Sequence, residues 1–142
     1  MLTVFIPGPP VPQGRARLSR TGVHIMAPAS RAWRTVAVQV LTLARVRARL
    51  EPIDEIVEVK IDVVTERPES RPRLVKRDVW ATKARCLSGG KGDADNYAKA
   101  VLDAMVNAGV LKDDHTVAVL TVRKWYAAAG GDVGVNASVK VS

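Results

Sequence analysis

Residues 93–109 read DADNYAKAVLDAMVNAG and predict an amphipathic helix from Asp95 to about Ala108. At roughly 100° per residue, the apolar side chains gather on one face and the polar side chains on the opposite face. Gly109 follows the last apolar position, as expected of a glycine that ends a helix. We expect the apolar face (Tyr97, Val101, Ala104, Met105 and Ala108) to be buried and the polar face (Asp95, Asn96, Lys99, Asp103 and Asn107) to meet a site or solvent.

Short alternating segments on both sides of this helix predict strands. Residues 56–64 alternate apolar side chains with Glu58, Lys60 and Asp62, the pattern of a strand with one wet face. A second helix is expected from about residue 30 to residue 50, with Ser30 as its N-cap. Further strands are expected at residues 2–6, 23–26, 116–126 and 133–141, and a glycine-containing hairpin at 127–132 is expected to join the last two. The sequence therefore predicts an α+β fold, a small mixed sheet of four to five strands with two main helices.

Length and composition indicate one globular domain. The chain has 142 residues, 47% of them apolar, which suffices for a single domain over residues 1–142 with its own core. Cys86 is the only cysteine, so no intrachain disulfide can form. The apolar runs are too short to cross a bilayer, and the N-terminus leads into prolines rather than into a signal peptide. We therefore expect a soluble cytoplasmic protein that does not contact membranes.

Positive charge is concentrated in the first third of the chain. Residues 1–50 contain eight arginines and no acidic residue, whereas residues 51–142 contain 14 basic and 14 acidic residues, so the net charge of +8 resides in the first segment. Arginine binds phosphate bidentately, which favours a nucleic-acid partner over a merely solvated surface.

Residues 66–92 form a long segment that is also basic. It contains two prolines, a Gly89-Gly90 pair, and eight basic residues against three acidic ones. Loops of this length in compact domains are usually functional or disordered. Two interpretations stay open, a disordered excursion and a DNA-contacting flap that becomes ordered on its substrate. For Trp80, within this segment, the alternatives are a wedge between bases and an anchor to the core.

Acidic residues gather around the predicted helix at 95–108. Asp93 precedes the helix, Asp95 lies in its first turn, and the pair Asp113-Asp114 follows it. Taken alone, Asp93 could be an N-cap, and Lys99 could form ordinary salt bridges with the carboxylates one turn away on either side. Taken together, the acids and the neighbouring amide of Asn96 supply oxygen ligands of the kind that Mg²⁺ prefers.

Other metal sites are not supported by the residue pattern. In an EF-hand loop that starts at Asp93, position six would be Ala98 rather than glycine and position twelve would be Ala104 rather than glutamate. Zinc lacks a ligand set, because His24, His115 and Cys86 are isolated in the sequence.

These residues resemble the RusA family of Holliday-junction resolvases, which is common in phages and prophages. The resemblance rests on residues 93–104, on residues 107–114 (NAGVLKDD), on a strand that ends at Lys124, on the PxxQGRxR segment at residues 10–17 and on the helix near Trp33. It implies a small homodimeric, Mg²⁺-dependent endonuclease that resolves four-way or other branched DNA by paired, symmetric nicks. If the chain is encoded by a phage, it implies action in the host cytoplasm.

By position in the motif, the resemblance assigns the family's three catalytic aspartates to Asp93, Asp95 and Asp114 and its essential lysine to Lys99. The aspartates would hold one or two Mg²⁺, for which Mn²⁺ could substitute, and no small-molecule cofactor is expected. Lys99 would orient the nucleophilic water or stabilise charge in the transition state. The sequence departs from the family pattern at Gly92, where proline or a basic residue is usual, and in the length of residues 66–92. Both departures bear on junction specificity rather than on the chemistry.

Further residues are candidates for binding. DNA is expected to contact Gln13, Arg15, Arg17, Arg20, Arg71, Arg73, Lys76, Arg77, Lys91 and Lys124, and the secondary candidates of the site are Asn96, Asp103, Asp113 and His115. Two other functions are open from the residues alone. One is a non-catalytic, structure-selective DNA-binding protein, which would leave every strand of a junction whole, and the other is an RNA-binding module.

The predicted helix separates the predicted ligands. From Asp95 to Ala108 it is roughly 20 Å long at 1.5 Å per residue, and the chain from Ala108 to Asp114 can return at most ~20 Å when extended. Closure within one chain is therefore barely possible. Two such helices packed antiparallel about a two-fold axis would bring Asp114 of one subunit near Asp93 and Asp95 of the other, so we predict a site shared across a homodimer.

Overall fold

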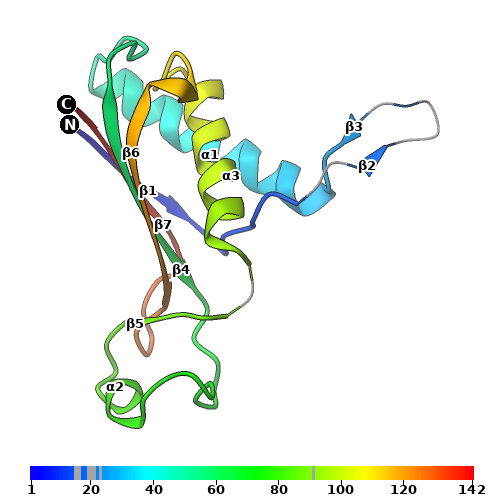
Figure 1. The fold of residues 1–142 in the computed structure, drawn as a ribbon, viewed down its shortest axis with the longest axis vertical. Coiled ribbons are helices and arrows are strands. Elements are labelled where there is room, and N and C mark those ends of the chain that lie inside the picture. The colour runs from blue at the N-terminus through cyan, green and yellow to red at the C-terminus, as the bar shows by residue number, and fades with distance from the viewer. Residues whose placement is uncertain (15–16, 19–21, 23, 91) are drawn as a thin grey trace.

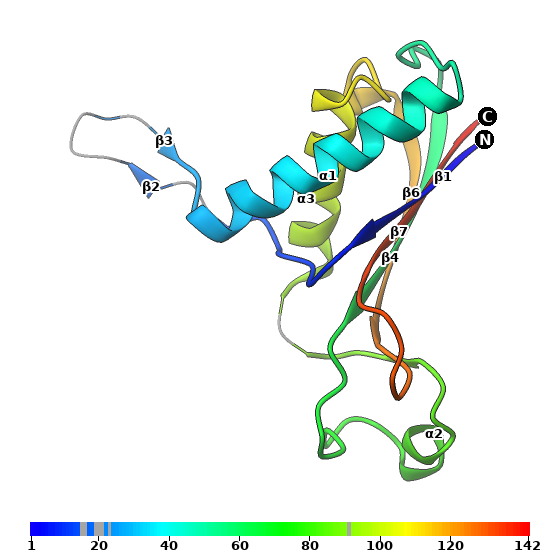
Figure 2. The same ribbon diagram turned by 180° about the vertical axis from the view of Figure 1, so that it is seen from behind.

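The computed structural model describes residues 1–14, 17–18, 22, 24–90 and 92–142, with the backbone alone at 17–18 and 24–25. Its main body is a five-stranded mixed sheet with two long helices on one face (Figures 1 and 2). The expected α+β fold is confirmed. The sheet contains β1 (Leu2–Pro7), β4 (Val57–Thr65), β5 (Cys86–Leu87), β6 (Val117–Tyr126) and β7 (Gly134–Val141), and a separate two-stranded pair contains β2 (Arg17–Leu18) and β3 (His24–Ile25).

The strand order of the sheet is β1-β7-β4-β6-β5. β7 pairs antiparallel with both β1 and β4, whereas β4 pairs parallel with β6. The expected hairpin between β6 and β7 is therefore wrong, because β4 lies between these strands and the connection at 127–133 crosses over it. β4 takes the central place because Val57, Val59 and Val63 are fully buried, and a central strand has both backbone edges paired as well.

Helix α1 (Pro28–Arg47) buries Trp33, Ala37 and Leu41, which recur at helical spacing. Its N-cap is Ala27, so the expected N-cap at Ser30 is wrong, and Ser30 lies buried within the first turn. Pro28 explains the earlier start, because a proline at the first helical position has no N–H to leave unsatisfied and its φ already suits a helix.

Helix α3 (Ala94–Asn107) matches the helix expected from the sequence to within one residue at each end. All five residues of its predicted apolar face are buried: Tyr97, Val101, Ala104, Met105 and Ala108. Gly109, with φ +74°, caps the C-terminus as expected. Its N–H donates to the carbonyl of Val106, and the N–H of Val110 donates to the carbonyl of Met105, which satisfies two carbonyls that the helix leaves free.

One face of the sheet carries the core. The odd-numbered residues of β4 and β7 pack with α1 and α3, while Glu58, Lys60 and Asp62 lie on the opposite face, as the alternation in residues 56–64 predicted. Figure 2 shows both long helices on the same side of the sheet and the two chain ends next to each other. α3 contacts β6 and α1 contacts β1, so α3 lies toward the β6 side of the sheet.

Residues 66–92 are not a featureless loop. They contain a short helix, α2 (Arg77–Ala81), and β5, which is bound to the end of β6. Val75, Cys86 and Tyr126 form a small core of their own, and Trp80 packs against it with its ring edge-on to Tyr126 at 6.1 Å. The anchoring role considered for Trp80 is confirmed. This region, hereafter the α2 lobe, lies at the end of the sheet opposite the chain ends (Figure 1).

No helix within the described residues is both long enough and apolar enough to span a membrane.

Candidate active site

Two carboxylates meet at the N-terminal end of α3. Asp93 is the N-cap residue, with extended φ and ψ, yet its side chain makes no capping hydrogen bond to the helix. Asp95 lies in the first turn, and both side chains are exposed. The helix dipole stabilises negative charge at this end. The two acids are therefore close in the chain, open to solvent and not consumed by capping.

The chain reaches Asp93 through a glycine that no other residue could replace without strain. Gly92 has φ +88°, a conformation that residues with a Cβ rarely adopt. A Cβ at this position would lie 2.5 Å from Cε2 of Tyr97, whose buried ring fills the space beneath. Gly92 thus allows the backbone to pass directly over this ring and into the helix.

Two long-range contacts hold the start of α3 against the rest of the protein. Nζ of Lys124, on β6, donates to the carbonyls of Gly90 (2.9 Å) and Gly92 (2.7 Å). The backbone N–H of Gln13 donates to the carbonyl of Asn96 at 3.1 Å. The residues just before Asp93, the first turn of α3 and the segment at residues 10–14 are thus joined in one place, although about 80 residues separate Gln13 from Asp93 in the sequence.

Lys99 lies one turn beyond Asp95 on the same exposed face. Within the described part of the chain it forms no ion pair with Asp95 or Asp103, so the two salt bridges that would have given it a purely structural role are not formed. Asp103 instead pairs with Arg34 of α1, with Nη2 at 3.0 Å from Oδ2. The ammonium of Lys99 is left exposed beside the acidic end of the helix.

The other predicted acid lies beyond the opposite end of α3. Asp114 begins a short 3₁₀ helix (Asp114–Thr116) that leads into β6, and its side chain is exposed. Asp113 caps this turn by accepting the backbone N–H of His115 at 3.0 Å, and the His115 ring lies 3.0 Å from the same carboxylate. These hydrogen bonds from His115 lower the pKa of Asp113 to about 2. An open hollow of about 310 Å³ lies here, lined by Arg34, Asp103, Val106, Asn107, Asp113 and Asp114.

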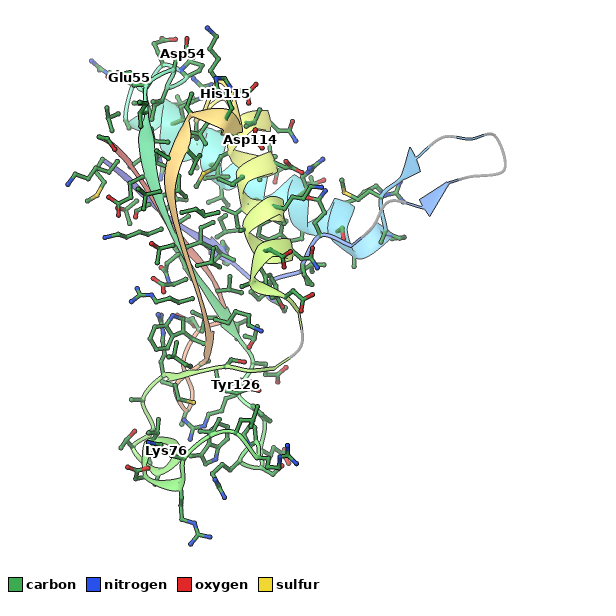
Figure 3. All side chains as sticks on the ribbon, in the orientation of Figure 1. Asp54, Glu55, Lys76, Asp114, His115 and Tyr126 are labelled. Atoms are coloured by element: carbon green, nitrogen blue, oxygen red, sulfur yellow. The ribbon has the colours of Figure 1, made fainter. Side chains whose placement is uncertain are left out.

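The structure does not bring the three predicted aspartates together in one chain. α3 is 14 residues long, roughly 20 Å at 1.5 Å per residue, with Asp93 and Asp95 at its start and Asp114 beyond its end. Among the described residues, no three His, Cys, Asp or Glu side chains form a group that could hold a metal ion. Figure 3 shows Asp114 and His115 at the same end of the sheet as Asp54 and Glu55, with Tyr126, where β6 ends, far from them. One chain therefore presents two acids at one end of α3 and one at the other.

Comparison with known sequences identifies the family. The family described as Endodeoxyribonuclease RusA matches residues 7–136, which is most of the chain. The chain belongs to the RusA family of endodeoxyribonucleases. It is also similar to the uncharacterized protein YqaN of Bacillus subtilis (strain 168), with 36% identity over 123 residues that cover 84% of each chain. The resemblance drawn from residues 93–114 is confirmed, and with it the activity class of an endonuclease that acts on DNA.

Within this RusA-family chain, the predicted DNA-binding residues lie in three regions. Arg73, Lys76 and Arg77 are exposed on the α2 lobe, where Figure 3 labels Lys76, but the guanidinium of Arg71 donates to the carbonyl of Val75 within the lobe. Gln13 lies at the start of α3, and Lys124 binds the glycine carbonyls before Asp93. The remaining residues of this prediction are Arg17, described only as backbone in β2, and Arg15, Arg20 and Lys91, which lie outside the described residues.

Three positioning residues were missed in the sequence. Arg34 binds Asp103 from a helix 69 residues away, and nothing local marks the pair. Arg67 lies over the Trp80 ring at 3.9 Å and donates to the Trp80 carbonyl, so it anchors the α2 lobe. Gly92 was noted only as a departure from the family pattern. The available signal was that this residue is a glycine, because glycine is the usual residue where the chain needs a positive φ or passes close to another group.

Proposed function

We propose that this RusA-family protein is a Mg²⁺-dependent endonuclease that resolves Holliday junctions and related branched DNA by paired nicks during recombination and repair. The observation that supports this proposal is the N-terminal end of α3. Asp93 and Asp95 are exposed there, and the Asp93 side chain makes no capping hydrogen bond. Lys99 follows one turn later and forms no ion pair among the described residues. Two exposed carboxylates with a lysine one turn away suit the hydrolysis of a phosphodiester.

The donor set at this end suits a hard divalent cation. Asp93 and Asp95 would hold Mg²⁺, which takes one or two carboxylates and completes its shell with waters and substrate phosphates. When bound, the ion would supply a nucleophilic water and neutralise charge on the phosphate and the leaving oxygen. Lys99 would hold its ammonium near the scissile phosphate and stabilise the charge that develops there. The N-terminal dipole of α3 and the Lys124 clamp would keep both aspartates in place.

Asp114 completes the site in this proposal, but from the second subunit of a homodimer. Within one chain it lies about a helix length from Asp93 and Asp95. A two-fold axis that runs α3 antiparallel to its copy would place each Asp114 beside the other subunit's aspartate pair. Two equivalent sites would result, and a four-way junction requires two opposed cuts.

Basic surfaces would hold the junction arms. The exposed Arg73, Lys76 and Arg77 of the α2 lobe would contact the phosphates of one DNA segment. Phosphate contacts of this kind orient a duplex without reading its sequence. Binding should therefore weaken steeply as salt is raised, because each neutralised phosphate releases counterions.

A synthetic four-way junction tests the activity directly. We expect symmetric nicks with Mg²⁺ or Mn²⁺ and none with EDTA, and we expect Asp93→Asn to abolish nicking while it leaves junction binding equal or tighter, because it removes negative charge near phosphate. A protein that shifts the mobility of the junction but cuts no strand would be the non-catalytic binder instead. Preference for RNA over the junction, with indifference to Asp93→Asn, would indicate the RNA-binding module.

Subunit mixing tests the shared site separately. A heterodimer of an Asp93→Asn chain and an Asp114→Asn chain has one intact site if Asp114 acts across the interface, and no intact site if all three acids act within a chain. We expect the mixed heterodimer to regain single-strand nicking without paired resolution, while either variant alone stays inactive. An inactive heterodimer, prepared with two affinity tags to establish its composition, would contradict the shared site.

A further inference from the structure

Leu74 is the most exposed large apolar side chain of the α2 lobe. It is 77% exposed, and among the described residues only Met1, at the chain end, exposes a larger fraction of such a side chain. Trp80, the residue considered above as a wedge between bases, packs against the small core of the lobe instead. The apolar group that the lobe presents most fully to its surroundings is therefore a leucine that its own core does not use.

A β-turn holds Leu74 in this exposed position. Arg73 and Leu74 are the two central residues of the turn, and the N–H of Val75 donates to the carbonyl of Pro72 at 3.0 Å. The guanidinium of Arg71 donates to the carbonyl of Val75, whose side chain is buried in the core of the lobe. The turn is thus braced by hydrogen bonds and anchored by the residue that follows Leu74, so its tip points outward because of the fold.

Basic side chains surround this tip. Arg73 precedes Leu74, and Lys76 and Arg77 follow it, all three exposed. Residues 69–78 contain four basic and two acidic side chains, the acids being Glu69 and Asp78.

This combination indicates the chemistry of the partner. The centre of a protein–protein interface is depleted of charge, whereas the tip of this turn places one apolar side chain among several cations. Nucleic acid offers the matching surface, because the apolar faces of its bases are bordered by phosphates on both strands. Leucine is one of the side chains that proteins insert between bases, and arginine and lysine are the usual phosphate ligands.

Leu74 also lies close to the proposed cleavage site. Its Cδ1 lies over Gly89, where an added Cβ would be 3.3 Å from it. Gly89 is four residues before Asp93, so their Cα atoms are at most about 14 Å apart. The tip of Leu74 is therefore within roughly 20 Å of Asp93, or about six stacked bases at 3.4 Å per base. One DNA strand can reach both places.

We propose that Leu74 is a wedge that packs against the open face of a base pair at the branch point and so selects branched DNA over linear duplex. This inference deepens the proposed function and rests on it for the substrate. In a linear duplex each base pair is stacked on both sides, and a leucine enters only if two pairs separate, which costs stacking energy. At a branch point the strands already part, so the leucine reaches a base-pair face at lower cost.

Binding without cleavage measures this selection. In EDTA, we expect Leu74→Ala to bind a synthetic four-way junction about tenfold more weakly than the parent, as for the loss of a buried leucine side chain, and to bind a linear duplex of the same sequence almost as well as the parent. Leu74→Met retains the apolar bulk and should bind the junction like the parent. Leu43→Ala, at a leucine of α1 that is 50% exposed, is the matched control and should bind both DNAs like the parent.

The fluorescence of 2-aminopurine reports the wedge itself, because this base becomes brighter when it loses a stacked neighbour. We place it in turn at each base pair within about six steps of the nicked position. Saturating parent protein should raise the signal at least about twofold at one of these positions, and saturating Leu74→Ala should give less than about half of that rise.

The variants should remain folded, because Leu74 is exposed, and thermal unfolding checks this. Leu74→Gln, which is polar but similar in length, is the second variant and should show the same loss of junction binding as Leu74→Ala. Folded variants that keep the parent's preference for the junction would overturn the wedge. So would an equal loss of binding to linear duplex, or a 2-aminopurine signal that does not depend on Leu74.

The wedge and the proposed function can fail separately. A protein whose preference for junctions depends on Leu74, but which never nicks them, would support the wedge and contradict the nuclease. A protein that nicks junctions, while Leu74→Ala and Leu74→Gln keep the parent's preference for them, would support the nuclease and contradict the wedge.

Discussion

The two ends of helix α3 use the same residue type for opposite purposes. At the C-terminal end, Asp103 binds Arg34, Asp113 caps a 3₁₀ turn and Asp54 binds Lys112 at 2.7 Å. At the N-terminal end, Asp93 and Asp95 have no such partner among the described residues, although one of them occupies the N-cap. Acids that hold the fold together and acids that are free to bind a cation are thus separated along one helix. Asp114 is the exception: it lies beyond the C-terminal end of α3, where the other acids stabilise the fold, yet its side chain is exposed and the proposed site requires it as a metal ligand.

The largest loss of cleavage is expected when a proposed metal ligand is replaced, and Asp114 is one of these ligands. Asp95→Asn and Asp114→Asn should each lower junction cleavage by about 10³-fold or more, because each removes a charged ligand of the ion that activates water. Glu55→Gln, an exposed acid at the same end of the sheet as Asp114, is the matched control and should change the rate less than twofold. Single-turnover cleavage of a labelled junction gives the rates. If Asp114→Asn cleaves like the control, Asp114 is not a metal ligand, and all the acids at the C-terminal end of α3 serve only the fold.

Replacement of Lys99 should have the next largest effect. Lys99→Met keeps the length of the side chain but removes its charge, and we expect cleavage to fall about 10²-fold, as for the loss of one group that stabilises transition-state charge. Lys99→Arg should recover part of the rate. Because Lys99 is exposed and makes no ion pair with Asp95 or Asp103, the thermal midpoint should not move. A shift in stability with an unchanged rate would instead indicate a structural lysine.

Gly92→Ala tests whether the free acids depend on the chain path that leads to them. The substitution adds a Cβ 2.5 Å from the Tyr97 ring, so either this ring or the backbone that leads to Asp93 must shift. We expect the buried ring to hold its place and Asp93 to be displaced, and a displacement of about 1 Å should lower cleavage about tenfold or more. Gly130→Ala is the control, since Gly130 also has a positive φ, +72°, but no atom within 4 Å of the added Cβ. Both variants carry backbone strain of about 1 to 2 kcal/mol. Equal cleavage by the two would show that Asp93 does not depend on Gly92.

Arg34→Ala tests the structural end, where stability rather than catalysis should change. Arg34 and Asp103 are each less than one-third exposed, at 28% and 29%, and they join α1 to α3. Loss of this pair should reduce the free energy of unfolding by about 1 kcal/mol, or about 3 °C in thermal midpoint. Arg31→Ala, at an exposed position of α1, should have no comparable effect. A cleavage defect larger than threefold would place Arg34 in the site rather than in the scaffold.

Asp62 lies on β4, away from both ends of α3, so its replacement should change the stability of the fold and have the smallest effect on cleavage. Burial raises the pKa of Asp62, but hydrogen bonds from Arg123 and Trp125 outweigh it, so the pKa lies below its ordinary value of 3.8. The ionised carboxylate therefore stabilises the fold above that pH, and this stabilisation is lost as the pH falls through the lower, folded-state pKa. Asp62→Asn should cost about 1 to 2 kcal/mol at pH 7, and the difference from the parent should shrink below about pH 4.

Thermal unfolding at several pH values gives this measurement, with Asp132→Asn as an exposed control. A difference between Asp62→Asn and the parent that stays constant down to pH 2 would mean that the carboxylate charge is not what stabilises the fold.

The local parts of this molecule were predictable from the sequence. The amphipathic pattern of residues 93–109 predicted α3, its buried face and its glycine cap, because these depend on residues within a few turns of one another. The proximity of Asp93, Asp95 and Lys99 was predictable for the same reason. The alternation in residues 56–64 predicted which side of β4 is buried.

Features that depend on distant contacts were not predictable. β4 pairs in parallel with β6 from about 60 residues away, and no local pattern distinguishes this order from a β6–β7 hairpin. The small core of the α2 lobe uses Val75, Trp80, Cys86 and Tyr126, which have no common period. For Asp114, the relation to the other acids is still a prediction, because one chain cannot bring it to them.

The position of β7 has a consequence for how the protein forms. β7 (Gly134–Val141) is inserted between β1 and β4 and bonds to both. During synthesis, β1 is made first but has no strand to pair with in this sheet until β7 follows, more than 120 residues later. Contacts of such long sequence separation close slowly. A ribosome-bound chain that lacks β7 therefore has β1 unpaired in this sheet, and the five-stranded order is completed only when β7 has been made.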